Sequence, residues 1–232
     1  MTRGMHQVVL LALLFVAASL SAAAVPAPAL ARCNPFRTNN GIAYDVWHRN
    51  SDITSTGGVY ANLLNYSVYA ATSAATRGVV GFDYPADATN KYAEIGWTEN
   101  NAGTRHTMVQ YIKSGSVYTF NYGSYRTGSY TYYTALYDPS NQQMKFEAAG
   151  TTLKQVTGSW GPYRGYLDSV IWTLASQMPG GTSAHEWWKD AHVYRGGWHN
   201  FNETSSTTNT TYFGLGSTDS LTYSGWDKSC ST

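Results

Sequence analysis

Charged residues and cysteines are scarce in this sequence. Lys, Arg, Asp and Glu make up 12% of 232 residues, the formal net charge is +1 at pH 7, and there are two cysteines. A nucleic-acid-binding protein normally needs a basic patch that neutralises phosphates, so this charge balance argues against that class. The sequence also lacks a Gly-x-Ser-x-Gly motif, a phosphate-binding loop and a dinucleotide fingerprint. It therefore carries no local signature of a serine hydrolase or of a nucleotide-binding protein.

Metal-binding patterns are missing as well. His185-Glu186 opens like a zincin motif, but Lys189 stands where the second histidine must come. If the segment is a strand, Glu186, Asp190 and His192 share one face, yet alternate positions spread them over about 13 Å, too far for one ion. We therefore predict no metal and no cofactor.

A single long apolar run, Val8–Leu20, lies near the start of the chain. It follows a short segment containing Arg3 and precedes Ala29-Leu30-Ala31, which matches the A-x-A cleavage pattern of secretory signals. A membrane anchor is the weaker interpretation, because the run is short and small residues and prolines follow it. We predict that residues 1–31 are a signal peptide cut before Arg32, and that the product is extracellular with no membrane association.

Removing the first 31 of 232 residues leaves 201, the size of one domain, residues 32–232. Cys33 and Cys230 lie near the two ends of this domain, and in an exported protein one disulfide between them is the simplest arrangement. On the chain-entropy model it would stabilise the fold by about 4 to 5 kcal/mol. A metal site or a reactive thiol fits less well, because there is no C-x-x-C motif. We expect a monomer.

The remaining pattern is that of short strands separated by turns. Two hairpins are predicted, one turning at Lys113-Ser-Gly115 and the other at Asp138-Pro-Ser-Asn141. The one candidate helix is a turn or so within residues 166–175, and residues 170–172 are equally compatible with a strand. Many short strands without helix alternation favour an all-β fold, an antiparallel jelly-roll β-sandwich.

Two glutamates occupy mid-strand positions among aromatic residues. In Tyr92–Trp97, alternation places Glu94 on the face of Tyr92 and Gly96, and Ala93, Ile95 and Trp97 on the other. A charge that only aids solubility would more naturally lie in a loop or at an edge.

The second glutamate lies in the segment from Thr182 to Val193. Strict alternation places Glu186, Trp188, Asp190 and His192 on one face, with Trp187, Ala191 and Val193 on the other. Trp187 and Val193 are therefore expected in the core. Our hypothesis is that the two segments are neighbouring strands of one sheet and that Glu94 and Glu186 face each other.

Short motifs around both glutamates resemble a known family. Val80-Gly-Phe-Asp83 is followed, eleven residues after Asp83, by Glu94 within Ala93-Glu-Ile-Gly96. This order resembles the eqolisin family of glutamic peptidases, in which a V-G-I-D run precedes the catalytic Gln of an L-Q-T-G run. His185-Glu-Trp187 resembles the A-E-W run of that family, whose Glu is the catalytic base. The resemblance spans roughly residues 78–200 and implies a concanavalin-like sandwich.

On this alignment Glu94 takes the Gln position and Glu186 that of the base. A Glu/Glu pair departs from the eqolisins and is similar to the neprosin-like glutamic peptidases. The resemblance implies a secreted glutamic-type endopeptidase in which the pair activates water. Two adjacent carboxyls cannot both ionise easily, so activity at acid pH is expected. Tyr92, Trp97 and Trp188 are the expected substrate-binding residues.

Other functions stay open. Mid-strand glutamates can instead be exposed on a solvent face or paired with Lys or Arg, in a protein that is not an enzyme. A secreted carbohydrate-binding, lectin-like sandwich would use the abundant Trp and Tyr to stack sugars. A structural extracellular protein is the third class. The expected partner is thus an extracellular polypeptide or polysaccharide, with no nucleic acid.

Overall fold

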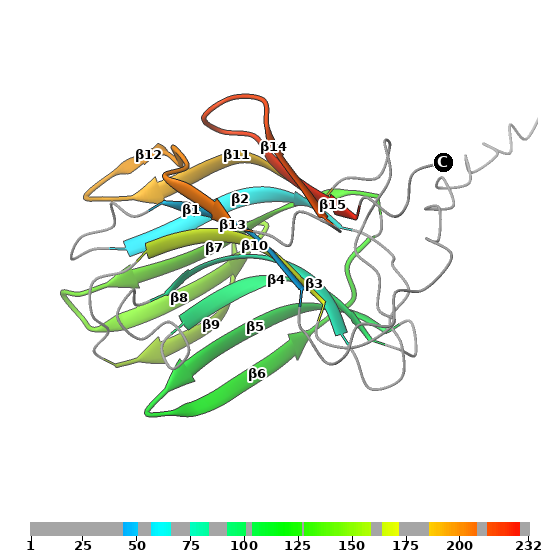
Figure 1. Ribbon diagram of the computed structural model, residues 1–232. Coiled ribbons are helices and arrows are strands. Elements are labelled where there is room, and N and C mark those ends of the chain that lie inside the picture. Colours follow the sequence, from blue (N-terminus) through cyan, green and yellow to red (C-terminus); the bar gives the residue numbers. More distant parts are fainter. Residues whose placement is uncertain are drawn as a thin grey trace, which may run out of the picture.

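Two antiparallel sheets lie face to face (Figure 1). The computed structural model describes residues 44–50, 57–65, 75–83, 92–100, 104–126, 128–158, 164–171, 186–207 and 213–227. These residues form strands, turns and loops, and no helix among them is long and apolar enough to cross a membrane. The predicted all-β jelly-roll sandwich is confirmed. The predicted signal peptide and the Cys33–Cys230 disulfide lie outside the described residues.

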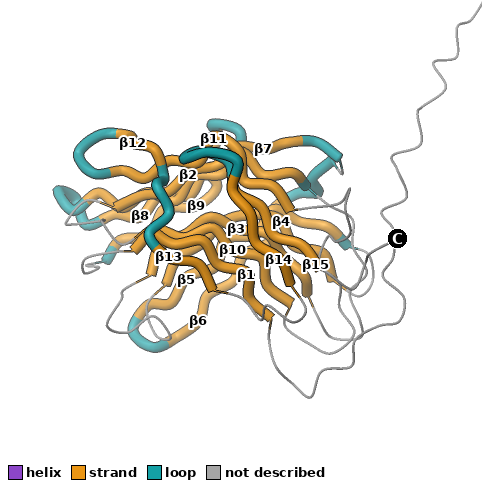
Figure 2. The backbone as a smooth tube through the Cα atoms, turned by 45° about the horizontal axis from the view of Figure 1, so that its top comes forward, coloured by secondary structure: helices purple, strands orange, loops and turns teal. Residues whose placement is uncertain are grey.

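Each sheet combines strands from distant parts of the chain, and Figure 2 shows the two layers from a second direction. The first sheet has the order β13 (Ser205–Thr207), β1 (Tyr44–Asn50), β10 (Arg164–Ile171), β3 (Ala75–Asp83), β4 (Tyr92–Asn100), β5 (Arg105–Lys113) and β6 (Ser116–Tyr122). The second sheet has the order β14 (Phe213–Ser217), β15 (Tyr223–Asp227), β11 (Glu186–Tyr194), β2 (Gly57–Leu64), β7 (Tyr130–Asp138), β8 (Gln143–Ala148) and β9 (Thr151–Thr157), and β12 (Trp198–Asn200) pairs with β11.

Both predicted hairpin turns are confirmed. Between β5 and β6, Ser114 and Gly115 have φ of 53° and 74°, the left-handed pair that matches the twist of a tight hairpin. Between β7 and β8, the Asp138 carboxylate accepts a hydrogen bond from the Ser140 N–H at 2.9 Å. The helical turn considered for residues 166–175 is wrong as far as residue 171, because β10 occupies 164–171. Pairing with β1 and β3 on both sides gives this segment the partners of a central strand.

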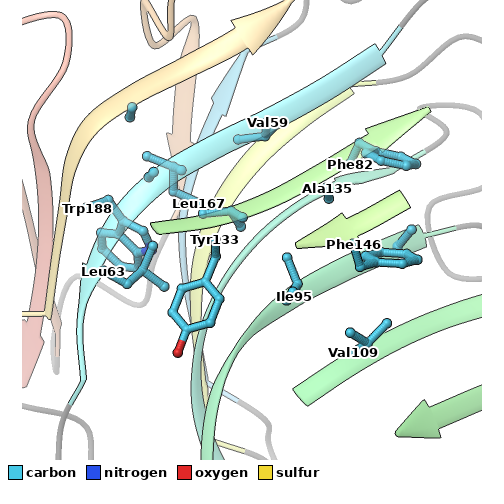
Figure 3. Packing of buried hydrophobic residues seen from close by; sticks show 14 of the residues in the cluster. Val59, Leu63, Phe82, Ile95, Val109, Tyr133, Ala135, Phe146, Leu167 and Trp188 are labelled. Atoms are coloured by element: carbon cyan, nitrogen blue, oxygen red, sulfur yellow. The ribbon is translucent and has the colours of Figure 1, made fainter. Parts of the chain in front are cut away.

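The core fills the space between the two sheets (Figure 3). The first sheet contributes Val80, Phe82, Ile95, Trp97, Val109 and Leu167, and the second contributes Val59, Leu63, Tyr133, Phe146, Trp188 and Val193. The indole N–H of Trp188 crosses between the layers and donates to the Val79 carbonyl at 3.1 Å. Alternation in β4 predicted that Ala93, Ile95 and Trp97 share a face, and all three lie in this core.

Polar contacts also join the sheets near β1. His48 of β1 is 1% exposed, and its Nδ1 lies 3.1 Å from Glu203 Oε2. Its Nε2 lies 3.0 Å from the Ser224 carbonyl oxygen of β15 in the second sheet. Because a buried polar side chain is costly without partners, these contacts fix β1 against the second sheet.

Leu63→Ala should test the inter-sheet core. Leu63 has no exposed surface, so its truncation removes buried methyl groups and leaves a cavity, lowering the free energy of unfolding by about 2 to 5 kcal/mol. Val117→Ala is the matched control, because Val117 is 56% exposed and the expected change is below about 0.5 kcal/mol. Urea denaturation measures both values. Equal small losses in the two variants would contradict this assignment of the core.

Candidate active site

The two glutamates predicted to pair lie on strands of different sheets. Glu94 is on β4 of the first sheet, and Glu186 is on β11 of the second. The prediction that these strands are neighbours in one sheet is therefore wrong. Local alternation orients the side chains of a strand, but the partners of that strand are set by long-range packing.

Glu186 points into the core between the sheets. It is fully buried, and its Oε1 accepts a hydrogen bond from the Trp97 indole N–H at 3.1 Å. Gly78 of β3 makes this contact sterically accessible, because a Cβ there would lie 2.7 Å from Oε1 of Glu186. Oε2 has no hydrogen-bond partner within the described part of the chain. Burial raises the pKa of Glu186 well above its ordinary value, and the Trp97 hydrogen bond opposes this only partly. Glu186 thus favours the neutral acid.

Glu94 points to the opposite, outer face of the first sheet. Its carboxylate forms an ion pair with Arg77 of β3 and accepts a hydrogen bond from the Tyr166 hydroxyl at 2.9 Å. Trp97, on the core face of the same strand, contacts Glu186. The two glutamates are therefore on opposite sides of β4, and the predicted facing pair is not formed.

A polar cluster surrounds Glu94 on this outer face. Gln110 Oε1 accepts from Arg77 Nη1 at 2.6 Å and from the Tyr92 hydroxyl at 2.7 Å. A fourth strand, β10, also contributes to this face. In its antiparallel pairing with β3, Asp168 lies opposite Val79, so the Asp168 side chain is on the same outer face. We call the set the outer-face cluster: Arg77, Tyr92, Glu94, Gln110, Tyr166 and Asp168. Glu94, Tyr166 and Asp168 are each no more than 2% exposed.

A glycine of β3 lets residues two strands apart meet. Gly81 lies between Glu94 of β4 and Tyr166 of β10 in the sheet register. A Cβ at Gly81 would come within 2.7 Å of the Tyr166 hydroxyl oxygen. The missing side chain therefore leaves room for the tyrosine to lie across β3 and reach Glu94.

The charges in the outer-face cluster stabilise one another. Burial by itself lowers the pKa of Arg77, but the nearby Glu94 and Asp168 outweigh burial, and the pKa is raised overall. Burial raises the pKa of Tyr92 to about 12 and that of Tyr166 well above its ordinary value. Both tyrosines are thus neutral hydrogen-bond donors beside a permanently charged guanidinium. The cluster combines carboxylates with fixed donors.

The three predicted substrate-binding residues are also divided between the outer face of the first sheet and the inter-sheet core. Tyr92 belongs to the outer-face cluster, through its hydrogen bond to Gln110. Trp97 and Trp188 point into the core between the two sheets, away from the outer-face cluster. A role for these two tryptophans in contacting substrate is therefore wrong for the described structure.

Local sequence patterns do not indicate three residues of the cluster, Arg77, Tyr166 and Asp168. Arg77 stands three residues before the Val80-Gly-Phe-Asp83 run, outside the motif. Tyr166 and Asp168 are two residues apart and so share one face of β10. This shared face follows only when the whole of Arg164–Ile171 is a strand, and the sequence left a helical turn open there.

The fold is similar to that of solved glutamic peptidases. A structure of scytalido-glutamic peptidase with a transition state analog inhibitor has a TM-score of 0.56 and 13% identity, covering 83% of this chain and 99% of that one. A second, with a peptide-based transition state analog, has a TM-score of 0.53 and 15% identity at the same coverage. SCP-B, an eqolisin-family peptidase in complex with the tripeptide Ala-Ile-His, has a TM-score of 0.50 and 14% identity, also covering 83% and 99%.

No protein-family model and no curated protein sequence matches the chain. The structural similarity confirms the resemblance to the eqolisin sandwich at the level of the fold.

Glu186→Gln should change the pH dependence of stability. The folded-state pKa of Glu186 is raised, so the stabilisation by its neutral acid is complete below the unfolded pKa of about 4.3 and is lost as pH rises toward the folded value. Relative to the variant, the wild-type free energy of unfolding should therefore fall above about pH 4.3, by up to about 1.4 kcal/mol per pH unit. Urea denaturation across this range measures the difference. Curves that stay parallel would show that Glu186 ionises in the folded protein as it does in the unfolded chain.

Proposed function

We propose that the protein is a secreted hydrolase of peptide bonds and that the outer-face cluster carries its acid–base chemistry. One observation supports this most directly: two carboxylates, Glu94 and Asp168, share a sheet face with Arg77 and a neutral Tyr166. Buried ionisable groups held together in this way are more frequent at functional sites than elsewhere. The fold shared with solved glutamic peptidases makes peptides the favoured substrate class.

The residues of the cluster fit the steps of amide hydrolysis. One carboxylate of the cluster, Glu94 or Asp168, takes a proton from water as the water attacks the carbonyl carbon of the peptide bond. The Arg77 guanidinium has further N–H donors besides the one paired with Glu94, and these can stabilise the developing oxyanion. The carboxylic acid formed in the first step then returns its proton to the leaving amine. Glu94 orients Arg77 through its ion pair, and the Tyr166 hydroxyl fixes Glu94 by donating a hydrogen bond to it.

The proposed working range is acid pH. A guanidinium beside a carboxylate favours the charged carboxylate, so the base is available in acid solution. Repulsion between the carboxyls of Glu94 and Glu186 does not contribute to this pH range, because the two glutamates are not in contact.

Glu94→Gln and Asp168→Asn should each lower peptidase activity by about a hundredfold or more, the usual contribution of general acid–base catalysis. Casein hydrolysis, followed from acid to neutral pH, measures the loss. Glu186→Gln should retain activity, because Glu186 lies in the core. Glu147→Gln, on the second sheet, is a surface control. Loss of activity in Glu186→Gln with Glu94→Gln unaffected would assign the chemistry to the core glutamate instead.

A non-catalytic function remains the alternative. It predicts that the wild-type protein leaves casein intact at every pH while remaining folded. In that case the ion pair of Arg77 with Glu94 has a structural role only, compensating the charge of two buried side chains.

Secretion is part of the proposal and has its own test. Expression of the full chain in a secreting bacterial host should release a protein whose N-terminus is Arg32. Mass spectrometry under non-reducing conditions should find the peptides of Cys33 and Cys230 joined by a disulfide. Retention of the uncut chain in the cells would contradict the predicted signal peptide.

A further inference from the structure

The outer face of the second sheet carries a group of contacting aromatic side chains. Tyr60 of β2 stacks on His192 of β11, with ring centroids 4.7 Å apart and planes 19° apart. Trp198 of β12 contacts Tyr60 at 4.7 Å and Tyr194 at 5.2 Å, edge to face in both cases. Tyr132 of β7 contacts Tyr60 at 6.1 Å. We call these five residues the aromatic platform.

The platform faces solvent. Trp198 is 40% and Tyr132 46% exposed, whereas the neighbouring residues that point the other way, such as Val59 and Tyr133, have no exposed surface. Three of the strands that carry the platform, β11, β2 and β7, lie side by side in the middle of the second sheet, and β12 pairs with β11 (Figure 1). Aromatic rings gathered on a solvent face are not needed for the core, and such patches commonly mark a binding surface.

A strained residue adds a carboxylate to the platform. Asp190 has φ of 52°, and the register of β11 shifts between Lys189 and His192 at a β-bulge. The bulge is fixed by the adjacent loops, since the Ala191 N–H donates to the Leu221 carbonyl at 2.8 Å. Non-glycine residues with left-handed backbone are costly, and bulges that turn a side chain toward a surface are frequent at functional sites.

A hydrogen bond and a nearby imidazole orient this carboxylate among the rings. The Tyr132 hydroxyl donates to Asp190 Oδ2 at 3.1 Å, and His192 Nδ1 lies 3.5 Å from Oδ1. The hydrogen bond to Asp190 raises the pKa of Tyr132, so its hydroxyl stays neutral. The Asp190 side chain is 43% exposed and keeps room for a further donor.

The charges of the platform indicate an uncharged ligand. Lys189, next to Asp190, has its ammonium 4.6 Å from the ring centroid of Tyr130 and 5.9 Å from that of Trp187. The positive charge of Lys189 and the negative charge of Asp190 offset each other, so neither a polyanion nor a polycation is favoured as the ligand. The surface instead offers aromatic faces for C–H groups together with acceptors and donors for hydroxyls.

We propose that the aromatic platform binds a neutral polysaccharide, with a pyranose ring stacked at Trp198 and Tyr132 and a sugar hydroxyl donating to Asp190. The site is separate from the outer-face cluster, which lies on the first sheet. Binding would hold the protein on a polysaccharide-containing surface whether or not the chain hydrolyses peptides.

Pull-down of the mature protein with microcrystalline cellulose and chitin, and affinity electrophoresis in xylan and laminarin, test the proposal. Wild type should bind at least one of these four polysaccharides. Trp198→Ala and Tyr132→Ala should each bind it roughly tenfold more weakly, as expected for loss of one aromatic contact. Asp190→Asn, which suits the left-handed backbone and keeps one acceptor, should weaken binding less.

Controls separate binding from folding and from hydrolysis. Tyr118→Ala removes a tyrosine of similar exposure, 42%, from β6 of the first sheet and should bind as wild type does. Glu94→Gln should also bind normally. Each variant is required to unfold cooperatively in urea. The proposal is overturned if wild type binds none of the four polysaccharides, or if folded Trp198→Ala and Tyr132→Ala both retain full binding.

Discussion

A carboxylate removed from water must be paired or protonated, and the two buried glutamates meet this requirement in different ways. Glu94 is held by Arg77 and Tyr166 on the outer face of the first sheet. Glu186 is placed in an apolar core where the acid form is favoured, with Trp97 as its donor. Glycines of β3 permit both arrangements, Gly81 on the outer face and Gly78 on the core face.

The two outer faces of the sandwich differ in character. That of the first sheet carries nearly buried charges linked by hydrogen bonds, an arrangement suited to proton transfer. That of the second sheet carries exposed rings around Asp190, an arrangement suited to adhesion. The inter-sheet core lies between them and separates the two sites. Substitutions in one of the two proposed sites are therefore expected to leave the structure of the other unchanged.

Sequence patterns that span a few residues predict this structure well, whereas pairings between distant segments leave no such pattern. Alternation correctly grouped Ala93, Ile95 and Trp97, and turn residues such as Gly115 located the hairpins. In β11 strict alternation failed because the bulge at Asp190 shifts the register. Ala191 and Val193 consequently share the core with Glu186 and Trp188, while Trp187 leaves it. The pairing of β10 with β3 joins residues far apart in sequence, and no local pattern encodes it, so the sequence does not indicate that Asp168 and Tyr166 join the outer-face cluster.

The same long-range pairing affects how the chain reaches its native state. β1 pairs with β10, and β2 pairs with β11, so strands at the start of the domain find partners more than a hundred residues later. Loop closure of this length makes folding slow compared with helical proteins of the same size. Neither sheet can be completed while the chain is still emerging from the ribosome.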